Sequence, residues 1–437
     1  MTAKSVMMKT NALVLALVLL LLAACGGAAA PVATGPTDAA TAVIGVATPA
    51  VAEPVESEPL TATPTDTLPP VSADAPLTGP IIAFTVEDSY EDTYLGLFDT
   101  ATGAYRDLPS TLGIAPGTAS WFGGGCGLYV DGRLFDLRGN LVWTPDPAAD
   151  VADAHGSQLS PDRAWLAHVV ESGATADGSP ARRDVELVRL SAPFERFLLT
   201  GNGGGHPAAL VWADATWLLY TDADAEGILQ LYRAAPDGGG REQLTSHTEL
   251  LDQINALAVS PDGRRLAYGV RNVVVPQQPY TYNEADEGWV GIVELDGSAA
   301  RQVRLPKLAG VELGRGLVWD AAGARLLVVG DSLPVGDDDP LHGRQVHWLT
   351  ADGTVERSFY QADAPSGQIG WVSPLSDIDT LLFSSGADTY RYEAGAVRRL
   401  EGAERPPLGM EVGRRPVGVL PAVVGFAGEA ACGLSAN

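Results

Sequence analysis

The sequence predicts an all-β protein whose main domain is a β-propeller built from four-stranded blades. The first observation is a repeat, because a strand, a tight turn and a second strand return about every 50 residues. The second is its clearest copy, residues 257–268 (LAVSPDGRRLAY), where a Ser-Pro-Asp-Gly turn separates two apolar runs. The third is the Asp296-Gly297 pair, a strong signal for a two-residue hairpin that adds two further strands. Four strands cannot bury their own apolar face, so the repeats are expected to pack around a common axis.

The repeats can be followed along the chain from their turn signals. In the clearest unit, the predicted strands are residues 254–260, 265–270, 289–295 and 301–305. The other units are expected at residues 117–145, 155–200, 206–250, 314–363 and 368–403, of which the first is short. Residues 81–109 supply strands at 81–86, 94–99 and 104–108, with no innermost strand before them.

The missing strand has a counterpart near the other end of the chain. Residues 416–424 (PVGVLPAVV) form a spare β-prone run after the last repeat. We expect this run to pair into the 81–109 blade, because closing the ring removes open sheet edges. This composite blade brings the count to seven. Six blades are the alternative, if residues 117–145 only decorate a neighbouring blade.

Composition excludes several classes of partner. The 437 residues carry a formal net charge of −26, with 54 acidic against 28 basic side chains. A nucleic-acid partner is not expected, because phosphate binding needs a concentrated cationic surface. Direct adsorption to anionic lipid headgroups is disfavoured for the same reason. A hydrophobic content of 46% excludes general disorder.

The first residues are a targeting signal. Lys4 and Lys9 precede an apolar segment at 12–22 that is short for a membrane span. The sequence Leu-Ala-Ala-Cys at 22–25 resembles the bacterial lipobox. That resemblance implies cleavage before Cys25 and acylation of its sulfur, which would anchor the protein in the lipid bilayer of the bacterial cell envelope. It would face away from the cytoplasm, at the outer membrane or the outer cell surface. The alternative is an ordinary signal peptide with an incidental cysteine.

Three regions follow from these patterns. Residues 1–25 are the lipoprotein signal peptide and lipobox, and residues 81–437 are the propeller. Between them, residues 26–80 are rich in alanine, proline and threonine and contain no lysine or arginine. Such a segment cannot bury enough apolar surface to offset its ordering entropy, so we expect a disordered tether.

The cysteines suggest one disulfide. The chain has three, and lipidation of Cys25 leaves Cys126 and Cys432. In an exported protein, an even pair is expected to be oxidised. Two separate buried thiols are the alternative. There is no C-x-x-C motif and therefore no zinc or redox site to predict.

The repeats resemble those of a known family. The Ser-Pro-Asp-Gly-Arg turn at 260–264, followed by an apolar strand, is similar to the repeats of TolB-like periplasmic propellers and of the propellers in prolyl-oligopeptidase relatives. The resemblance extends over about residues 81–403 and implies a scaffold rather than a chemistry. The amino-terminal α/β domain of TolB has no counterpart here, since the tether takes its place.

No catalytic residue, metal site or cofactor is predicted. There is no G-x-S-x-G motif. The segment 222–227 opens like a calcium loop, but its twelfth position is Arg233 instead of a glutamate. Paired carboxylates of the glycosidase kind stay open, because acidic residues are plentiful. The alternative function is therefore a propeller enzyme, a lyase or glycosidase acting at the central channel.

The long connecting loops favour binding. Residues 87–92, 171–183, 272–288 and 331–343 connect second to third strands and should share one rim of the propeller. Their aromatic and acidic residues are the rim candidates: Tyr90, Tyr280, Tyr282, Glu284, Asp286, Asp337, Asp338 and Asp339. We expect a monomeric, non-catalytic binding or assembly module for a protein, peptide or glycan. Neutral drift of the loops is the alternative.

Overall fold

The structure is a computed structural model, and it describes the propeller blades with gaps between some strands. The described residues are 76–88, 93–108, 119–122, 125–130, 132–149, 157–172, 182–199, 209–248, 253–271, 288–312, 316–332, 342–375, 377–408 and 414–420. The predicted signal peptide, Cys25 and all but the last residues of the predicted tether lie outside them. Within these ranges, no helix has both the length and the apolar character needed to cross a membrane.

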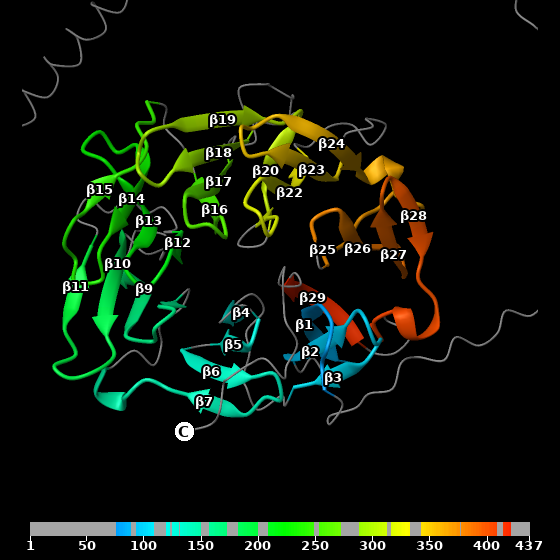
Figure 1. Ribbon diagram of the computed structural model, residues 1–437, viewed down its shortest axis with the longest axis horizontal. Helices are drawn as coiled ribbons and strands as arrows, with labels where there is room; N and C mark the ends of the chain where they lie inside the picture. Colours follow the sequence, from blue (N-terminus) through cyan, green and yellow to red (C-terminus); the bar gives the residue numbers. More distant parts are fainter. Residues whose placement is uncertain are drawn as a thin grey trace, which may run out of the picture. The chain divides into compact units, whose positions relative to one another are not determined.

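Seven antiparallel sheets are arranged in a ring, one after another along the chain (Figure 1). We number them as blades 1 to 7. Blade 1 contains β29 (Arg414–Leu420), β1 (Ile81–Asp88), β2 (Thr93–Asp99) and β3 (Tyr105–Asp107), and blade 2 contains β4 (Ala119–Phe122), β5 (Gly127–Val130), β6 (Arg133–Asp136) and β7 (Leu141–Trp143). Blade 3 contains β8 (Gln158–Leu159), β9 (Trp165–Ser172), β10 (Arg182–Arg189) and β11 (Arg196–Leu198), and blade 4 contains β12 (Leu210–Trp212), β13 (Leu218–Ala223), β14 (Leu229–Ala234) and β15 (Glu242–Gln243).

The remaining blades follow the same plan, with one irregular inner strand. Blade 5 contains β16 (Gln253–Val259), β17 (Arg265–Arg271), β18 (Trp289–Glu294) and β19 (Ala300–Arg304). Blade 6 contains β20 (Leu308–Val311), β21 (Leu317–Trp319), β22 (Arg325–Ser332), β23 (Arg344–Thr350) and β24 (Val355–Tyr360), and blade 7 contains β25 (Val372–Pro374), β26 (Thr380–Ser385), β27 (Asp388–Glu393) and β28 (Ala396–Arg399). Three short 3-10 helices complete the described elements: η2 (Pro147–Ala149), η4 (Gln361–Asp363) and η5 (Gly402–Glu404).

The predicted all-β fold with seven blades is confirmed, and the six-blade alternative is wrong. Residues 119–143 form a complete four-stranded sheet, β4 to β7, instead of decorating a neighbour. The four strands predicted in the clearest repeat match β16 to β19 to within one residue at each end.

The first blade takes its innermost strand from the far end of the sequence. β29 pairs antiparallel with β1, and Phe84 lies opposite Val419 while Asp88 lies opposite Arg414. The spare run expected at 416–424 is therefore observed as a strand at 414–420. With β2 on its other side, β1 has a hydrogen-bonded neighbour along both edges.

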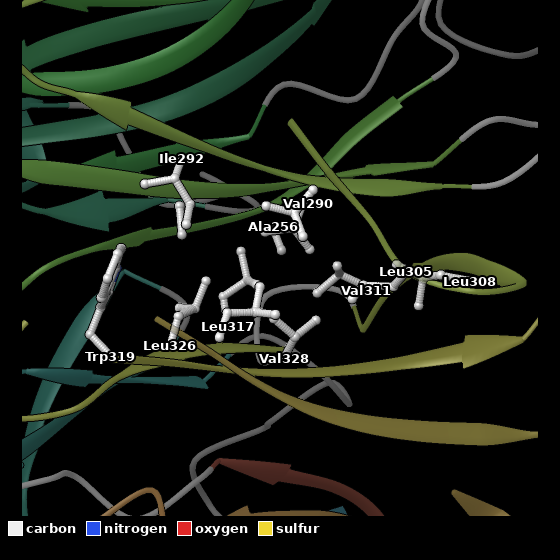
Figure 2. Packing of buried hydrophobic residues seen from close by; sticks show 13 residues of the cluster. Ala256, Val290, Ile292, Leu305, Leu308, Val311, Leu317, Trp319, Leu326 and Val328 are labelled. Carbon is white, nitrogen blue, oxygen red and sulfur yellow. The ribbon is translucent and has the colours of Figure 1, made fainter. Parts of the chain in front are cut away.

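An apolar cluster fills each seam between neighbouring blades. In the seam between blades 5 and 6, Ala256 and Ile292 pack with Leu326 in a row of side chains that runs from Trp319 at one end to Leu308 at the other (Figure 2). The seam between blades 7 and 1 is filled in the same way, by residues that include Phe84 and Leu382. Burial of these side chains supplies the main attraction between blades.

The antiparallel order gives the ring two different faces. Connections from first to second and from third to fourth strands lie on one side, which we call the turn face. Connections from second to third strands, and from each blade to the next, lie on the other side, the loop face. The turn-face hairpins are closed by their own side chains. In the 260–265 turn, Ser260 Oγ donates to Asp262 Oδ1 (2.5 Å), which also accepts from the Arg264 amide (3.1 Å).

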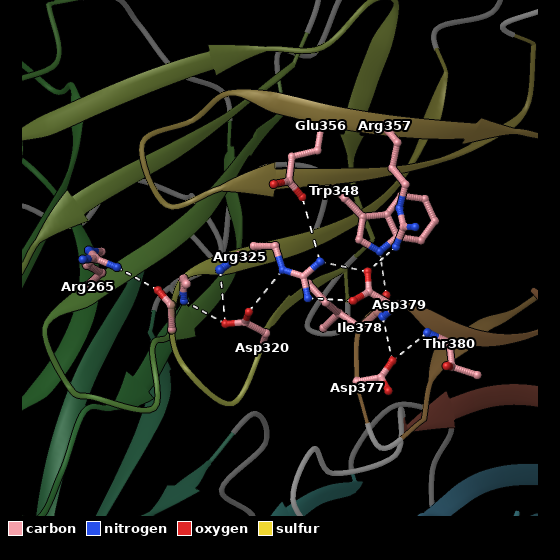
Figure 3. Close-up of polar contacts among 12 residues, drawn as sticks. Arg265, Asp320, Arg325, Trp348, Glu356, Arg357, Asp377, Ile378, Asp379 and Thr380 are labelled. Carbon is pink, nitrogen blue, oxygen red and sulfur yellow. Dashed lines mark hydrogen bonds and ion pairs between the residues drawn. The ribbon is translucent and has the colours of Figure 1, made fainter. Parts of the chain in front are cut away.

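Five arginines on the turn face, within the described residues, donate to the next blade: Arg106, Arg233, Arg265, Arg325 and Arg357. We call three of them, Arg233, Arg265 and Arg325, the arginine ties. Arg233 Nη1 donates to the Leu295 carbonyl (2.6 Å), and Arg265 Nη1 donates to the Gly323 carbonyl (2.7 Å). Arg325 donates to both carboxylate oxygens of Asp379, from Nη1 to Oδ1 at 2.9 Å and from Nη2 to Oδ2 at 2.6 Å (Figure 3). The hydrogen bonds from Arg325 hold the pKa of the Asp379 carboxyl below its usual value. The ties join blades 4, 5, 6 and 7 in sequence.

Candidate functional site

The predicted rim residues lie outside the described part of the chain. These are Tyr90, Tyr280, Tyr282, Glu284, Asp286, Asp337, Asp338 and Asp339. The structure does describe the strand ends between which their connecting segments run. All of these ends are on the loop face, because each segment connects a second strand to a third.

Two of these segments start and end beside the same short strand. β17 ends at Arg271 and the described chain resumes at Gly288, while β22 ends at Ser332. Between them lies β20, in which Leu308 pairs with Ser332 of blade 6. The Leu308 carbonyl also accepts from the Gly288 amide of blade 5, at 2.6 Å. One residue of β20 therefore holds the ends of both segments.

We call this region the blade 5/6 junction. Its residues are Asn255, Arg271, Gly288, Leu308–Val311, Glu312, Asp331, Ser332 and Arg344. Close backbone packing here requires glycine. A Cβ at Gly288 would lie 2.6 Å from the Val270 carbonyl oxygen, and one at Gly330 would lie 2.6 Å from the Gly310 carbonyl oxygen. Any side chain at either position would clash with backbone. Glycine at both positions therefore allows the strands that carry the two segments to lie this close together.

β20 was not predicted from the sequence. Only the later part of the blade 6 inner strand, β21, was expected, whereas both β20 and β21 pair with β22. The signal was a short apolar run, Leu308 to Val311, just after the fourth strand of blade 5. Four residues are too few to show a period, so this run reads as a connection.

Asn255 is an unusual polar residue at the junction. It occupies a bulge in β16, the innermost strand of blade 5, and is only 8% exposed. Its side-chain amide donates to the Val311 carbonyl of β20 at 2.6 Å. This bond fixes the amide, and within the described residues no donor reaches the other end, Asn255 Oδ1.

Two carboxylates lie beside the Arg344 guanidinium. Its guanidinium lies 3.2 Å from Asp331 Oδ1 and 3.6 Å from Glu312 Oε2, and also donates to the Gly370 carbonyl. The Asp331 side chain is 58% exposed and the Glu312 side chain 23%. One guanidinium therefore faces two carboxylates that solvent or a ligand can reach.

The calcium-like segment at 222–227 is a hairpin, as the missing glutamate indicates. Asp222 Oδ2 lies 2.7 Å from Arg241 Nη2, and burial raises the pKa of this carboxyl despite the arginine. Asp224 accepts from the Ile228 amide (2.9 Å) and from the Gln230 side chain (2.9 Å). Across the described ranges, no group of three or more His, Cys, Asp or Glu side chains is arranged to hold a metal ion.

Two histidines have partners within their own blades. His347 is fully buried, with Nδ1 2.8 Å from Ser358 Oγ and Nε2 3.1 Å from Gln345 Oε1. Burial lowers the pKa of His347 to about 4, so the ring is neutral at pH 7. His168 Nε2 lies 2.8 Å from Glu186 Oε2, which also contacts Arg196.

The chain enters the propeller on the turn face. Leu77 is buried, and the Asp99 carboxylate accepts from the Thr78 amide (2.7 Å) and the Gly79 amide (3.1 Å). Cys126 also lies on this face, between β4 and β5, and β29 runs toward the same face. Cys432 is outside the described residues, so its pairing with Cys126 stays a prediction.

No protein-family model matches the sequence, and no curated protein matches it either. Among solved structures, the chain is similar to a putative TolB from Agrobacterium tumefaciens, with 17% identity and a TM-score of 0.38 over 65% of this chain and 91% of that one. It is also similar to TolB from Acinetobacter baumannii, with 12% identity and a TM-score of 0.34 over 77% and 65% of the two chains. A structure of prolyl endopeptidases gives 13% identity and a TM-score of 0.44 over 75% of this chain and 50% of that one. At these identities the similarity concerns the propeller fold alone.

Proposed function

We propose that the protein is a lipid-anchored, extracytoplasmic binding protein whose propeller presents its loop face to a protein, a peptide or a glycan. The observation that supports this most is the blade 5/6 junction. There β20 holds together the ends of two segments that carry predicted rim residues, including Tyr280 and Asp338. Binding sites commonly consist of loops positioned by a rigid scaffold, and the junction provides such a scaffold for two loops at once.

The side on which the chain enters the ring supports the same choice of surface. On the turn face, carboxylates such as Asp262 are engaged by the amides of their own hairpins, and the arginine ties are engaged by the next blade. The segment that leads into β1 also joins the ring on this side. The predicted tether therefore joins the ring on the side opposite the loop face.

Anchoring through Cys25 rests on the Leu-Ala-Ala-Cys sequence and the apolar segment before it. In a bacterial host, the protein should fractionate with membranes and incorporate a labelled fatty acid. The Cys25→Ser variant should lose the label and leave the membrane fraction. A variant that stays tightly membrane-bound without label would refute the lipid anchor.

Photo-crosslinking in the full-length protein tests the binding surface. A photoreactive amino acid is placed at Tyr280 or Asp338 on loop-face segments, and at Asp237 or Ser298 in turn-face hairpins as matched controls. We expect discrete adducts from the loop-face positions only. Equal adducts from both faces, or none from the loop face, would contradict the proposed function.

A further inference from the structure

The innermost strands of the ring face its axis (Figure 1). Within the described part of the chain, these strands contain no aspartate or glutamate, although the sequence has 54 acidic residues; they are β4, β8, β12, β16, β20, β21, β25 and β29. Their basic residues are Arg414 and Arg415, both at the loop-face end of β29. The charges of this protein therefore lie almost entirely away from the axis.

At the turn face, the innermost strand of every blade ends in an apolar residue. These final residues are Phe122, Leu159, Trp212, Val259, Trp319, Pro374 and Leu420. Phe122 and Val259 are only half-buried, and so are Trp121 and Leu257 in the same two strands. Water thus reaches apolar side chains near the axis, where a further apolar segment would gain from packing.

Half-buried aromatic rings farther from the axis already have a cover. The guanidinium carbon of Arg233 lies 4.8 Å from the centroid of the Trp217 ring, and that of Arg189 lies 5.9 Å from the Trp165 ring. The hairpins around them also carry aspartates that accept their own backbone amides. An apolar segment on the turn face therefore gains most over the innermost strand ends.

β29 leads directly to this surface. It is the innermost strand of blade 1, it runs from the loop face to the turn face, and its Cα atoms come within 8 Å of those of β4. Residues 421–431 (PAVVGFAGEAA) follow it in the sequence and contain a single charged residue, Glu429. The chain thus delivers an apolar segment to the turn-face end of the axis.

The predicted disulfide would hold this segment at both ends. Cys126 follows β4 on the turn face, and Cys432 comes directly after residue 431. An extended chain of eleven residues spans about 35 Å, far more than the step between two neighbouring strands requires. With both ends held, the surplus length forms a loop on the turn face that can reach the axis.

We infer that residues 421–431 fold back over the axis on the turn face, with Phe426 packed against Trp121 and Phe122 of β4. The chain itself then covers this end of the ring, and a partner reaches the innermost strands from the loop face alone. The inference depends on β29 and on the apolar strand ends rather than on the proposed function, so either can fail without the other.

Intramolecular photo-crosslinking in the full-length protein tests the contact. Benzoylphenylalanine replaces Phe426, and mass spectrometry locates the crosslinked peptide. We expect it to contain Trp121 and Phe122, whereas the same amino acid at Ser298, in the exposed hairpin after β18, should give no crosslink to β4. The crosslink should persist in the Cys126→Ser/Cys432→Ser variant, because apolar packing holds the segment there without the disulfide.

Dye binding measures the cover by a second route. Truncation after Leu420 keeps β29 and removes the segment, so the fluorescence of a dye that binds apolar surface should rise about threefold. Phe426→Asp should raise it in the same direction, while Glu429→Gln, the matched control in the same segment, should leave it unchanged. If the truncated protein does not unfold cooperatively, Phe426→Asp and the crosslink decide the test.

Three results would overturn the inference. Crosslinks from position 426 to the outer hairpins, to other molecules or to nothing would place the segment elsewhere. Loss of the β4 crosslink in the double cysteine variant would mean that the disulfide alone holds the segment near β4. Equal dye fluorescence in Phe426→Asp and Glu429→Gln would mean that Phe426 covers no apolar surface. Crosslinks from Tyr280 or Asp338 to a partner are scored separately and decide the proposed function.

Discussion

The turn face and the loop face of this propeller differ in the length of some of their connections. On the turn face, hairpins are closed by serine and aspartate side chains, and arginines bind the neighbouring blade. On the loop face, some second-to-third connections are long, whereas Asp224 closes the short one between β13 and β14 and Arg344 donates to the Gly370 carbonyl ahead of blade 7. Both faces therefore carry contacts between blades, and the long connections of the loop face are where a binding surface is expected.

Removing β29 should have the largest effect on stability, because that strand runs from the loop face to the turn face as the innermost strand of blade 1. Truncation after Glu411 deletes the partner of β1 and leaves its inner edge unpaired. We expect a loss of more than about 5 kcal/mol, enough to abolish a cooperative thermal transition. A truncated protein that melts like the intact one would show that the seam between blades 7 and 1 suffices without the strand.

Reducing the predicted disulfide tests whether the turn face is also locked covalently. If Cys126 and Cys432 are bonded, they close a loop of about 300 residues, for which chain entropy gives at most about 5 kcal/mol. We expect reduction to lower the unfolding free energy by about 2–4 kcal/mol, and both thiols to resist alkylation beforehand. Free alkylation of Cys126 in the unreduced protein would exclude the bond.

Acid should lower the free energy of unfolding through His347, a buried residue of β23 in blade 6. Its pKa is 6.5 when the chain is unfolded and about 4 in the buried site, so the unfolded state binds the proton first as pH falls. The contribution of His347 to the free energy of unfolding is fully present above pH 6.5 and is lost progressively as the pH falls to about 4. Urea unfolding at pH 7 and pH 4.5 should show a loss about 2–3 kcal/mol smaller in His347→Gln than in the parent protein. If the parent protein and His347→Gln lost the same free energy of unfolding between the two pH values, burial would not lower the pKa of His347.

The smallest expected effect sharpens the comparison most directly. Arg325→Ala removes one of the two arginines that join blade 6 to Asp379, since Arg357 also contacts this carboxylate. The Arg325 and Asp379 side chains are about one-third exposed, and the substitution should cost about 1–2 kcal/mol. Arg304→Ala, on the exposed outer strand β19 toward the loop face, should cost less than about 0.5 kcal/mol. Chemical denaturation of the two variants measures the difference, and equal losses would contradict a special role for the ties.

Local patterns were enough to predict most of the fold. The strands of blade 5 could be placed because apolar runs and the turn at 260–264 recur, and β29 because blade 1 lacked an inner strand. β20 could not, because a four-residue strand has no detectable period and its partner is fixed by the packing of two blades. The junction was missed for the same reason. Asn255 looks like any polar residue until a bulge in β16 turns it toward Val311.

The capped entry segment has a mechanical consequence. Strands of a propeller run from face to face, so a pull on the residues before Ile81 acts along the length of β1. That strand is flanked by β2 and β29, and such a pull loads the hydrogen bonds of both ladders in shear at the same time. The Asp99 carboxylate accepts hydrogen bonds from the Thr78 and Gly79 amides, just before β1, where the force is applied. If the protein is anchored at this end and binds a partner on the loop face, tension between the two is therefore borne by hydrogen bonds loaded in shear.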